Sequence, residues 1–299
     1  METTDYNLFV RNSELTMQGW DSDKIVTALL RETGIEKTTA KEISKAVEEI
    51  VKKTGVSVTT PLIRELVNAK LVERGMKSIR DRHTRLGMPI YDVDCLLLYP
   101  NRENANVPHN PEATNLTLAE AIKKEYALLS VFSQDVSDAH MNGDIHLHDL
   151  GFIDRPYCSG QSLEYIKKFG LNLPHSLSMA NPAKHPEVLL AHLMKFAASL
   201  QGHFAGAIGW DAVNIFFAPY LEGMSDNEVK QLAQMLIYEF YQLAGARGSQ
   251  VVFTDFNLYW NIPRHFRDAP AIGPGGEYTG KTYKDYEKEA QTFLKALFE

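Results

Sequence analysis

The reactive thiols of this chain are few, since 299 residues include two cysteines, Cys95 and Cys158. Two thiols cannot build a disulfide framework or a zinc ribbon of paired CxxC motifs. Cys158 lies in DRPYCSGQSL, where Arg155 and the polar residues that follow indicate an accessible thiol, although a small buried cysteine is the alternative. Cys95 begins the apolar run CLLLY, which predicts burial. Any thiol chemistry is therefore expected at Cys158.

Two histidines lie ten to twelve residues before Cys158, in the string IHLHD. Because Ile145 and Leu147 alternate with His146 and His148, the pattern predicts a strand with both imidazoles on one face. Hydrogen-bonded histidines in the wall of a site are one interpretation. A metal-dependent hydrolase that uses both as ligands is another, and it needs further ligands on later strands. A third is that one of the two orients a small reductant beside Cys158.

A second group of candidates is suited to phosphate. Arg11 is expected at the end of the first strand and Lys24 in the first turns of a helix, whose N-terminal N–H groups would add to the site. Thr60 is expected to cap the third helix, with Pro61 at its first position. No GxxxxGK[ST] motif is present, so solvated surface charges are the alternative.

Asparagines precede the next helix, and their amides could hydrogen-bond a ribose or a phosphate, with turn formation as the alternative. These candidates are Asn104, Asn106 and Asn115, together with Glu112. The loop Gly273-Pro-Gly-Gly276 lacks a strand-GxGxxG-helix context and is predicted to be a surface connection.

Apolar periodicity places these residues on a series of elements. A strand or hairpin is predicted at 7–17, followed by helices at 21–32, from a capping box at Thr39, and from Thr60 to Gly75. Beyond a polar boundary, the predicted helices are one from a second capping box at Thr117 and others at 134–141, 186–200, 225–243 and 283–298, with strands at 145–148, 204–208 and 249–258. Helices that alternate with strands favour a parallel α/β sheet or barrel.

Composition places the chain among ordinary globular proteins, with 44% hydrophobic residues and a net charge of −7. The negative charge disfavours a nucleic-acid binder. No apolar run approaches the roughly 20 residues that span a membrane, and the first residues do not form a secretion signal. A cytoplasmic protein is therefore expected, with partners other than nucleic acid or membrane.

The first third of the chain resembles an ATP-cone regulatory domain, over roughly residues 6 to 98. The resemblance rests on FVRNSELTMQGWDSDKIVTALL and SVTTPLIRELVNAKLVERGM. It implies that Arg11, Lys24 and Thr60 bind a nucleotide effector, ATP or dATP. The cone's Lys-Arg-Asp-Gly pattern reads Val10-Arg11-Asn12-Ser13 here, without its lysine and glycine.

The remainder resembles the anaerobic, class III ribonucleoside-triphosphate reductases. The strings that carry this resemblance are HNPEATNLTLAEAIKKEYALLSVF, GDIHLHDLGFIDRPYCSGQSLEYIKKFGL, GHFAGAIGWDAVNIFFAPYLEGMSDNEVKQLAQMLIYEFYQL and RGSQVVFTDFNLYW. The implied fold is α/β, a mostly helical ATP-cone at 1–98 followed at 99–299 by the first part of a ten-stranded glycyl-radical barrel. Substrate contacts are then expected at Asn104, Asn106 and Asn115.

The resemblance also implies a reaction. A glycyl radical, installed by an S-adenosylmethionine iron–sulfur activase, oxidises a cysteine that abstracts the 3′ hydrogen of a ribonucleoside triphosphate. Cys158 matches a different cysteine, which takes part in reducing the 2′ position, with His148 or His146 beside it. Formate or a thiol protein supplies electrons, and a homodimer is expected.

Three motifs of the family are not in this sequence: the radical glycine, the second cysteine and the cysteine pairs of a zinc site. The chain is therefore expected to be the N-terminal portion of such an enzyme, with no metal bound by these residues. A nucleotide-sensing or assembly subunit without catalysis is the alternative, and a metal-dependent hydrolase at His146 and His148 is a third.

Overall fold

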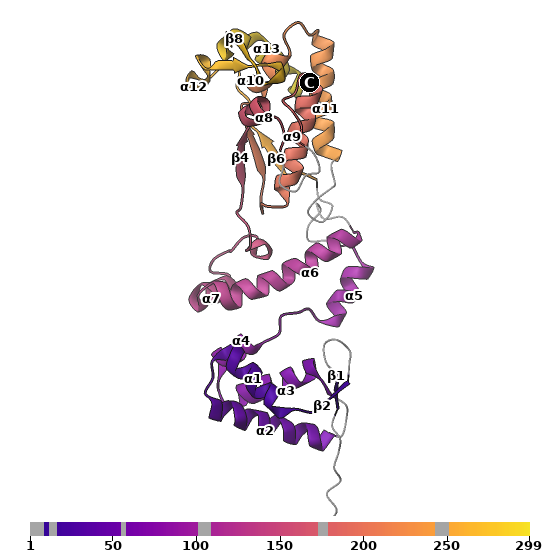
Figure 1. Ribbon diagram of the computed structural model, residues 1–299, viewed down its shortest axis with the longest axis vertical. Helices are drawn as coiled ribbons and strands as arrows, with labels where there is room; N and C mark the ends of the chain where they lie inside the picture. Colours follow the sequence, from indigo (N-terminus) through magenta and orange to yellow (C-terminus); the bar gives the residue numbers. More distant parts are fainter. Residues whose placement is uncertain (1–8, 12–16, 55–57, 101–108, 173–178, 243–250) are drawn as a thin grey trace, which may run out of the picture. The chain divides into compact units, whose positions relative to one another are not determined.

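The computed structural model describes residues 9–11, 17–54, 58–100, 109–172, 179–242 and 251–299 (Figure 1). Backbone packing divides the chain into two units, Met1–Gly87 with Glu125–His146, and Met88–Lys124 with Leu147–Glu299. The division into domains at residue 98 stays a prediction.

The first unit begins with a small sheet and four helices. Strand β1 (Phe9–Arg11) pairs antiparallel with β2 (Met17–Gly19) and parallel with β3 (Val58–Thr59), so the predicted hairpin is confirmed. The helices are α1 (Ser22–Thr33), α2 (Lys37–Thr54), α3 (Thr60–Glu73) and α4 (Lys77–His83). Their apolar faces enclose one core, whose fully buried side chains include Leu29, Ile43, Val47 and Leu71.

Local capping explains where these helices begin and end. Asp21 caps α1 by accepting a hydrogen bond from the Asp23 N–H at 3.0 Å, at the predicted start of this helix. Thr59 caps α3, one residue before the predicted Thr60, and accepts from the Leu62 N–H at 3.3 Å. Helix α2 begins two residues before the predicted capping box at Thr39. Gly75 follows α3 with a φ of +70°, a backbone conformation that favours glycine.

Two further helices differ from the sequence predictions: the first was not predicted, and the second was predicted to begin later. Helix α5 (Ile90–Leu98) buries none of its residues, and Cys95 on it is half-buried, so the predicted burial of Cys95 is wrong. Helix α6 (Pro111–Tyr126) begins after Asn110, whose side chain accepts from the Ala113 N–H at 2.9 Å. The predicted start at Thr117 is wrong, because that hydroxyl donates to the Ala113 carbonyl one turn back, inside the helix.

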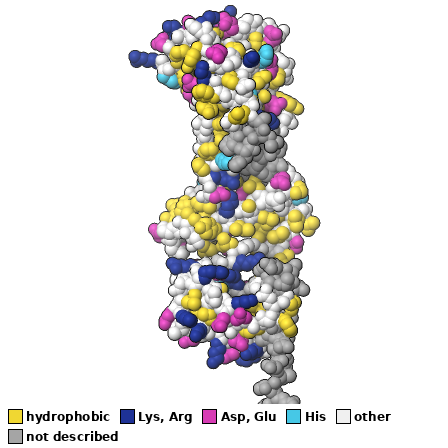
Figure 2. Space-filling model, viewed as in Figure 1, with side chains coloured by type: hydrophobic (Ala, Val, Ile, Leu, Met, Phe, Trp, Pro, Cys, Tyr) yellow, Lys and Arg dark blue, Asp and Glu magenta, His cyan; other side chains and the backbone are white. Residues whose placement is uncertain are grey.

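Hydrophobic side chains remain on the surface around these helices, as the yellow patches of Figure 2 show. On and beside α5 the large exposed side chains are Ile90, Tyr91, Leu97, Leu98 and Tyr99.

A single π-helical turn (Ala127–Val131) follows α6, and α7 (Gln134–Asn142) then forms as predicted.

The predicted strand at 145–148 is absent, and this prediction is wrong. These residues form no ladder with any described segment, and Asp149 after them has a φ of +50°, which interrupts an extended strand. A 3₁₀ turn, Leu150–Phe152, follows. His146 and His148 therefore do not lie on one face of a sheet.

The second unit contains a parallel sheet with the order β4-β5-β6. Its strands are β4 (Ser159–Ser162), β5 (Ile208–Asp211) and β6 (Thr254–Phe256), in register at Gly160, Gly209 and Asp255. Helices α8 (Glu164–Phe169), α9 (Pro186–Gln201), α10 (Val213–Phe217) and α11 (Asp226–Gln242) follow strands β4 and β5 in the sequence. The predicted parallel α/β arrangement is thus confirmed for these three strands, whereas a ten-stranded barrel stays a prediction.

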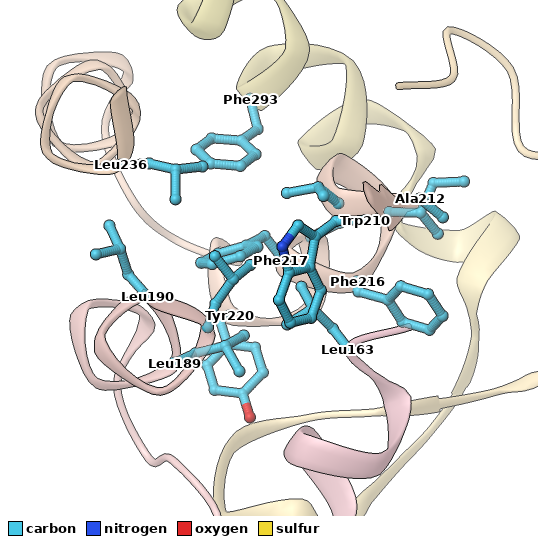
Figure 3. Close-up of a cluster of buried hydrophobic side chains, with 14 of the residues drawn as sticks. Leu163, Leu189, Leu190, Trp210, Ala212, Phe216, Phe217, Tyr220, Leu236 and Phe293 are labelled. Atoms are coloured by element: carbon cyan, nitrogen blue, oxygen red, sulfur yellow. The ribbon is translucent and has the colours of Figure 1, made fainter. Parts of the chain in front are cut away.

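One face of this sheet belongs to the core. Ile208 and Trp210 are buried on it, and the indole of Trp210 packs edge-on against Phe196 of α9, with ring centroids 5.9 Å apart. Figure 3 shows Trp210 among Leu163, Phe216 and Phe217, and further aliphatic side chains come from α9 and α11. Burial on this scale contributes roughly 1.5–3 kcal/mol for each large apolar side chain. Packing in the core therefore determines which face of the sheet is turned toward the helices and which face is left open.

The C-terminal part closes over the same core. A 3₁₀ turn (Ala218–Tyr220) follows α10, and the glycine-rich loop is a hairpin turn between β7 (Pro270–Ile272) and β8 (Tyr278–Thr282), with a 3₁₀ turn at Pro274–Gly276. A short helix, α12 (Arg264–Arg267), precedes it. Thr282 and Asp285 form a capping box for Tyr283–Tyr286, and α13 (Glu287–Phe298) completes the unit. None of the helices described is both long and apolar enough to cross a membrane.

Candidate functional site

A cavity of about 490 Å³ opens over the face of the parallel sheet that points away from the helices. Its volume is in the range of small-molecule sites. Apart from Trp210, which is buried in the core, the lining residues are small or polar, because alternate residues of a strand point to opposite faces and the large apolar ones point into the core. The cavity is lined by Cys158, Ser159, Gly160, Gln161, Ser162, Ala207, Gly209, Trp210, Asp211, Asp255 and Asn257.

Cys158 precedes β4 and is exposed at this cavity. Its sulfur lies against Gly206, where an added Cβ would come within 2.5 Å of Sγ. The Gly206 N–H donates to the Tyr157 carbonyl, which ties the turn before β5 to the chain before β4. A glycine at 206 thus provides the space that the thiol occupies.

His148 lies near the cysteine segment, because its ring contacts that of Tyr157, the residue before Cys158. Its imidazole contacts Tyr157 edge-on, with ring centroids 5.8 Å apart, and its Nε2 is 3.8 Å from Oδ2 of Asp149. His146 belongs to the first unit, where its ring lies 5.9 Å from that of His140. Of the two predicted histidines, the structure therefore brings His148 close to the cysteine segment.

Two carboxylates at the carboxyl ends of β5 and β6 differ in their surroundings. Asp211 accepts hydrogen bonds from the Tyr259 hydroxyl at 2.9 Å and from the Asn257 amide at 3.3 Å. The bond to Asp211 raises the pKa of Tyr259 above its usual value. Asp255 is exposed and lies over Gly209, where an added Cβ would come within 2.9 Å of its Oδ1. Asp211 is thus held by neighbours, whereas Asp255 faces the cavity.

A second cavity, of about 180 Å³, lies in the first unit between the small sheet and helices α1 and α3. Lys24 and Thr60, both predicted to bind phosphate, line it, and the Lys24 ammonium donates to the Gln18 side chain at 2.7 Å. Trp20 also lines it, and its buried indole N–H finds no acceptor in the described part of the chain. The other lining residues are Val10, Gly19, Asp21, Ile25, Ala28, Ile63, Arg64, Val67 and His83.

A charged network holds the inner wall of this second cavity. Arg64 of α3 binds both carboxylate oxygens of Glu32, at 2.7 and 3.2 Å, and donates to the His83 carbonyl at 2.6 Å. Hydrogen bonds from Arg64 lower the pKa of Glu32 to about 2. Burial, helped by the Arg64 charge, lowers the pKa of His83 to about 4, and neutral His83 donates from Nδ1 to Asn68 at 2.8 Å.

The remaining predicted residues do not appear in the described lining of either cavity. Arg11 ends β1, and nothing is described of its side chain. Asn104 and Asn106 lie outside the described residues, and Asn115 is exposed on α6. Within the described residues, no group of three or more His, Cys, Asp or Glu side chains could hold a metal ion, so nothing there supports the hydrolase interpretation.

Several lining residues were not predicted from the sequence. Asp211 lies three residues after the predicted strand at 204–208, and Asp255 lies three residues before the end of the predicted strand at 249–258; each is followed closely by an asparagine, in WDAVN and TDFN. Because ligands bind at the carboxyl ends of parallel strands, that position was the available signal. Trp20, Arg64 and His83 carry no comparable local pattern, since they meet only when α1, α3 and α4 pack.

These features define an α/β protein with a thiol-containing polar cavity over a parallel sheet, preceded by a helical unit with a cavity of its own. Residues 103–299 match the family model described as anaerobic ribonucleoside-triphosphate reductase. The chain therefore belongs to the anaerobic ribonucleoside-triphosphate reductase family. No curated protein matches the chain.

Solved structures resemble the chain at the level of fold. One, an anaerobic ribonucleotide reductase, has 22% identity and a TM-score of 0.51, with 64% of this chain and 33% of that chain covered. Another, the Thermotoga maritima anaerobic reductase with glycerol in its active site, has 21% identity and a TM-score of 0.50, covering 63% and 33%. The chain thus spans about a third of the length of these relatives.

Proposed function

We propose that this chain takes part in anaerobic reduction of ribonucleoside triphosphates to deoxyribonucleoside triphosphates, with Cys158 as a reducing thiol. The observation that carries the proposal is the exposed Cys158 thiol at a polar cavity over the open face of a parallel sheet. A structural cysteine would be enclosed by apolar neighbours, whereas this one borders a cavity large enough for a nucleoside.

The reaction replaces the C2′–OH bond of the ribose by C2′–H, and the hydroxyl leaves as water. Two electrons are required, from formate or a thiol protein. Cys158 is proposed as a thiol that contributes hydrogen to this exchange, and His148, whose ring contacts that of Tyr157 beside the cysteine, is proposed to orient the reductant. A glycyl radical, generated by an activating enzyme, and a second cysteine would supply the initial abstraction of the 3′ hydrogen from outside these 299 residues.

The first unit is proposed to sense nucleotide, with ATP and dATP as effectors. Its cavity combines a cation, Lys24, with the N-terminal turn of α3 at Thr60, and both features attract phosphate. The apolar wall and the unpaired Trp20 N–H suit a base with hydrogen-bond acceptors. A homodimer located in the cytoplasm accords with such an enzyme.

Turnover by the complete protein, encoded by the full reading frame, tests the proposal. Under anoxic conditions, with the activating enzyme and a reductant, we expect Cys158→Ser to abolish deoxyribonucleotide formation and to leave the glycyl radical detectable by electron paramagnetic resonance. Cys95→Ser is the matched control and is expected to retain turnover. Absence of turnover in the wild-type protein, with ATP binding retained, would instead indicate a regulatory subunit.

A further inference from the structure

The floor of the cavity beside Cys158 is formed by two glycines on neighbouring strands. Gly160 of β4 pairs in register with Gly209 of β5, and Gly209 pairs with Asp255 of β6. Above Gly160 the space is open, since an added Cβ would meet no atom within 4 Å. Above Gly209 the space is filled by the Asp255 carboxylate, 2.9 Å from the position of an added Cβ. The carboxylate therefore extends back across β5, toward the open floor.

The thiol borders the same open space from a different direction. Cys158 lies two residues before Gly160 and points to the same face, about 7 Å along the strand at 3.3 Å per residue. Gly209 lies one strand away from Gly160, about 5 Å across the sheet. A molecule resting on the backbone of Gly160 would thus have the thiol at one side and the Asp255 carboxylate at another.

The charges around the cavity indicate which part of a nucleotide would rest there. Its described lining holds two carboxylates and no Lys, Arg or His. Such a lining repels phosphate and favours an uncharged group that donates hydrogen bonds. Hydroxyl groups of a sugar meet that requirement, so the arrangement fits the ribose, with the phosphates outside the described lining.

The two carboxylates are not equally available to a sugar. Asp211 already accepts from Tyr259 and Asn257. The Asp255 carboxylate has no hydrogen bond or ion pair to any residue within the described ranges. An incoming hydroxyl would therefore donate to Asp255 first, because the acceptor oxygens of this carboxylate are not already used. Such a bond is also one of the stronger ones, because its acceptor is charged.

Building on the proposed function, we propose that the Asp255 carboxylate binds the ribose of the substrate by accepting hydrogen bonds from its 2′ and 3′ hydroxyls. This contact would hold the 2′ carbon over Gly160, within reach of Cys158. It would also distinguish a ribonucleotide from an analogue that lacks these hydroxyls. Asp255 is thus a substrate-binding residue rather than a group that transfers hydrogen.

Calorimetric binding to the complete protein tests the contact independently of turnover, with CTP and 2′,3′-dideoxy-CTP as probes. Loss of a hydrogen bond to a charged group weakens binding roughly ten- to a hundredfold. We expect the wild-type protein to bind CTP more tightly than the dideoxy analogue by such a factor, and Asp255→Ala to bind the two equally. Asp268→Ala, which removes an exposed carboxylate that does not line the cavity, is the control and should keep the preference.

Kinetics give the second arm of the test. Asp255→Ala should lower kcat/KM for CTP at least tenfold, and Asp255→Asn, which keeps a neutral acceptor, should lie between the alanine variant and the wild type. An unchanged preference for CTP over the dideoxy analogue in Asp255→Ala would overturn the inference. That outcome leaves the proposed function standing, whereas a wild-type protein that binds CTP but never forms deoxy-CTP would refute the proposed function alone.

Discussion

At the scale of single residues, the environment of the Cys158 thiol depends on a missing side chain. Gly206→Ala would place a methyl group 2.5 Å from Sγ and 3.1 Å from the Tyr157 carbonyl oxygen. Crowding of this kind costs about 1–3 kcal/mol, so we expect a lower free energy of unfolding, measured with urea. In a Cys158→Ala background the cost should shrink by about 1 kcal/mol, because the sulfur is gone.

Gly160→Ala provides the matched comparison for this prediction. No atom lies within 4 Å of an added Cβ there, and the residue does not have a positive φ. We expect its stability to equal or slightly exceed that of the wild type, since alanine loses less backbone entropy than glycine on folding. Equal destabilisation by the two alanine substitutions would contradict the proposed packing of the thiol on Gly206.

Lys24 allows a residue-scale test of the second cavity. If its ammonium binds a phosphate, Lys24→Glu should weaken ATP binding by more than the 0–1 kcal/mol of an exposed ion pair, and about 2 kcal/mol is expected for a charged hydrogen bond. Calorimetric titration of the chain with ATP measures this. Lys41→Glu, a charge reversal on an exposed residue of α2 that does not line the cavity, should leave the affinity unchanged. Equal affinity in Lys24→Glu would remove Lys24 from the site.

At the scale of elements, the packing of α1, α3 and α4 makes the first unit sensitive to acid. His83 has a folded pKa of about 4, so between pH 6.5 and 4 the unfolded chain takes up a proton that the folded chain does not. Stability therefore falls as the pH falls through this window, by up to about 3 kcal/mol. Glu32, with a folded pKa of about 2, extends the loss of stability from pH 4.5 downward. Protonation of its carboxylate breaks the ion pair with Arg64.

Hydrogen exchange of α3 peptides in the whole chain, corrected for the intrinsic rate at each pH, measures that stability. His83→Gln keeps an N–H donor without a titrating ring, so its protection should change little between pH 6.5 and 4, whereas wild-type protection should decline. A wild-type stability that is constant over this window would show that His83 is protonated within the folded unit.

Elements with local signals were predictable from the sequence, and those that depend on distant partners were not. Asp21 at the start of α1 and the αL glycine Gly75 after α3 mark helix ends by their own backbone chemistry, so these two helices were predicted from the sequence. The string IHLH alternates over four residues, which is too short to require a strand without a neighbouring edge, and none forms.

The candidate site shows the same division. Cys158 was identified because its residue type and polar neighbours are visible in the sequence, but the role of Asp255 depends on a register between strands 95 residues apart.

In the core, Lys167 is the clearest example of a residue whose environment could not be predicted from the sequence. It is fully buried, donates to the Phe216 carbonyl at 2.6 Å and lies over the rings of Phe216, Tyr220 and Tyr283. Burial holds the pKa of Lys167 well below its usual value, which no local pattern indicates.

At the scale of the whole molecule, the two units have separate hydrophobic cores with no buried residue in common. A unit with its own core can unfold as its own cooperative step. We therefore expect two transitions in the thermal unfolding of the chain. The sequence predicted a division at residue 98, which stays a prediction, and the return of residues 125–146 to the first unit was not predictable from periodicity.

Two leucines give a matched test of this independence. Leu29 of α1 and Leu236 of α11 are each fully buried, in the first and the second core respectively. Leu29→Ala and Leu236→Ala should each cost about 2–5 kcal/mol, and each should lower the midpoint of only its own transition in scanning calorimetry. ATP should raise the midpoint of the transition that Leu29→Ala lowers, because a ligand stabilises the unit that binds it. A single transition shifted equally by both substitutions would show that the two cores fold as one cooperative unit.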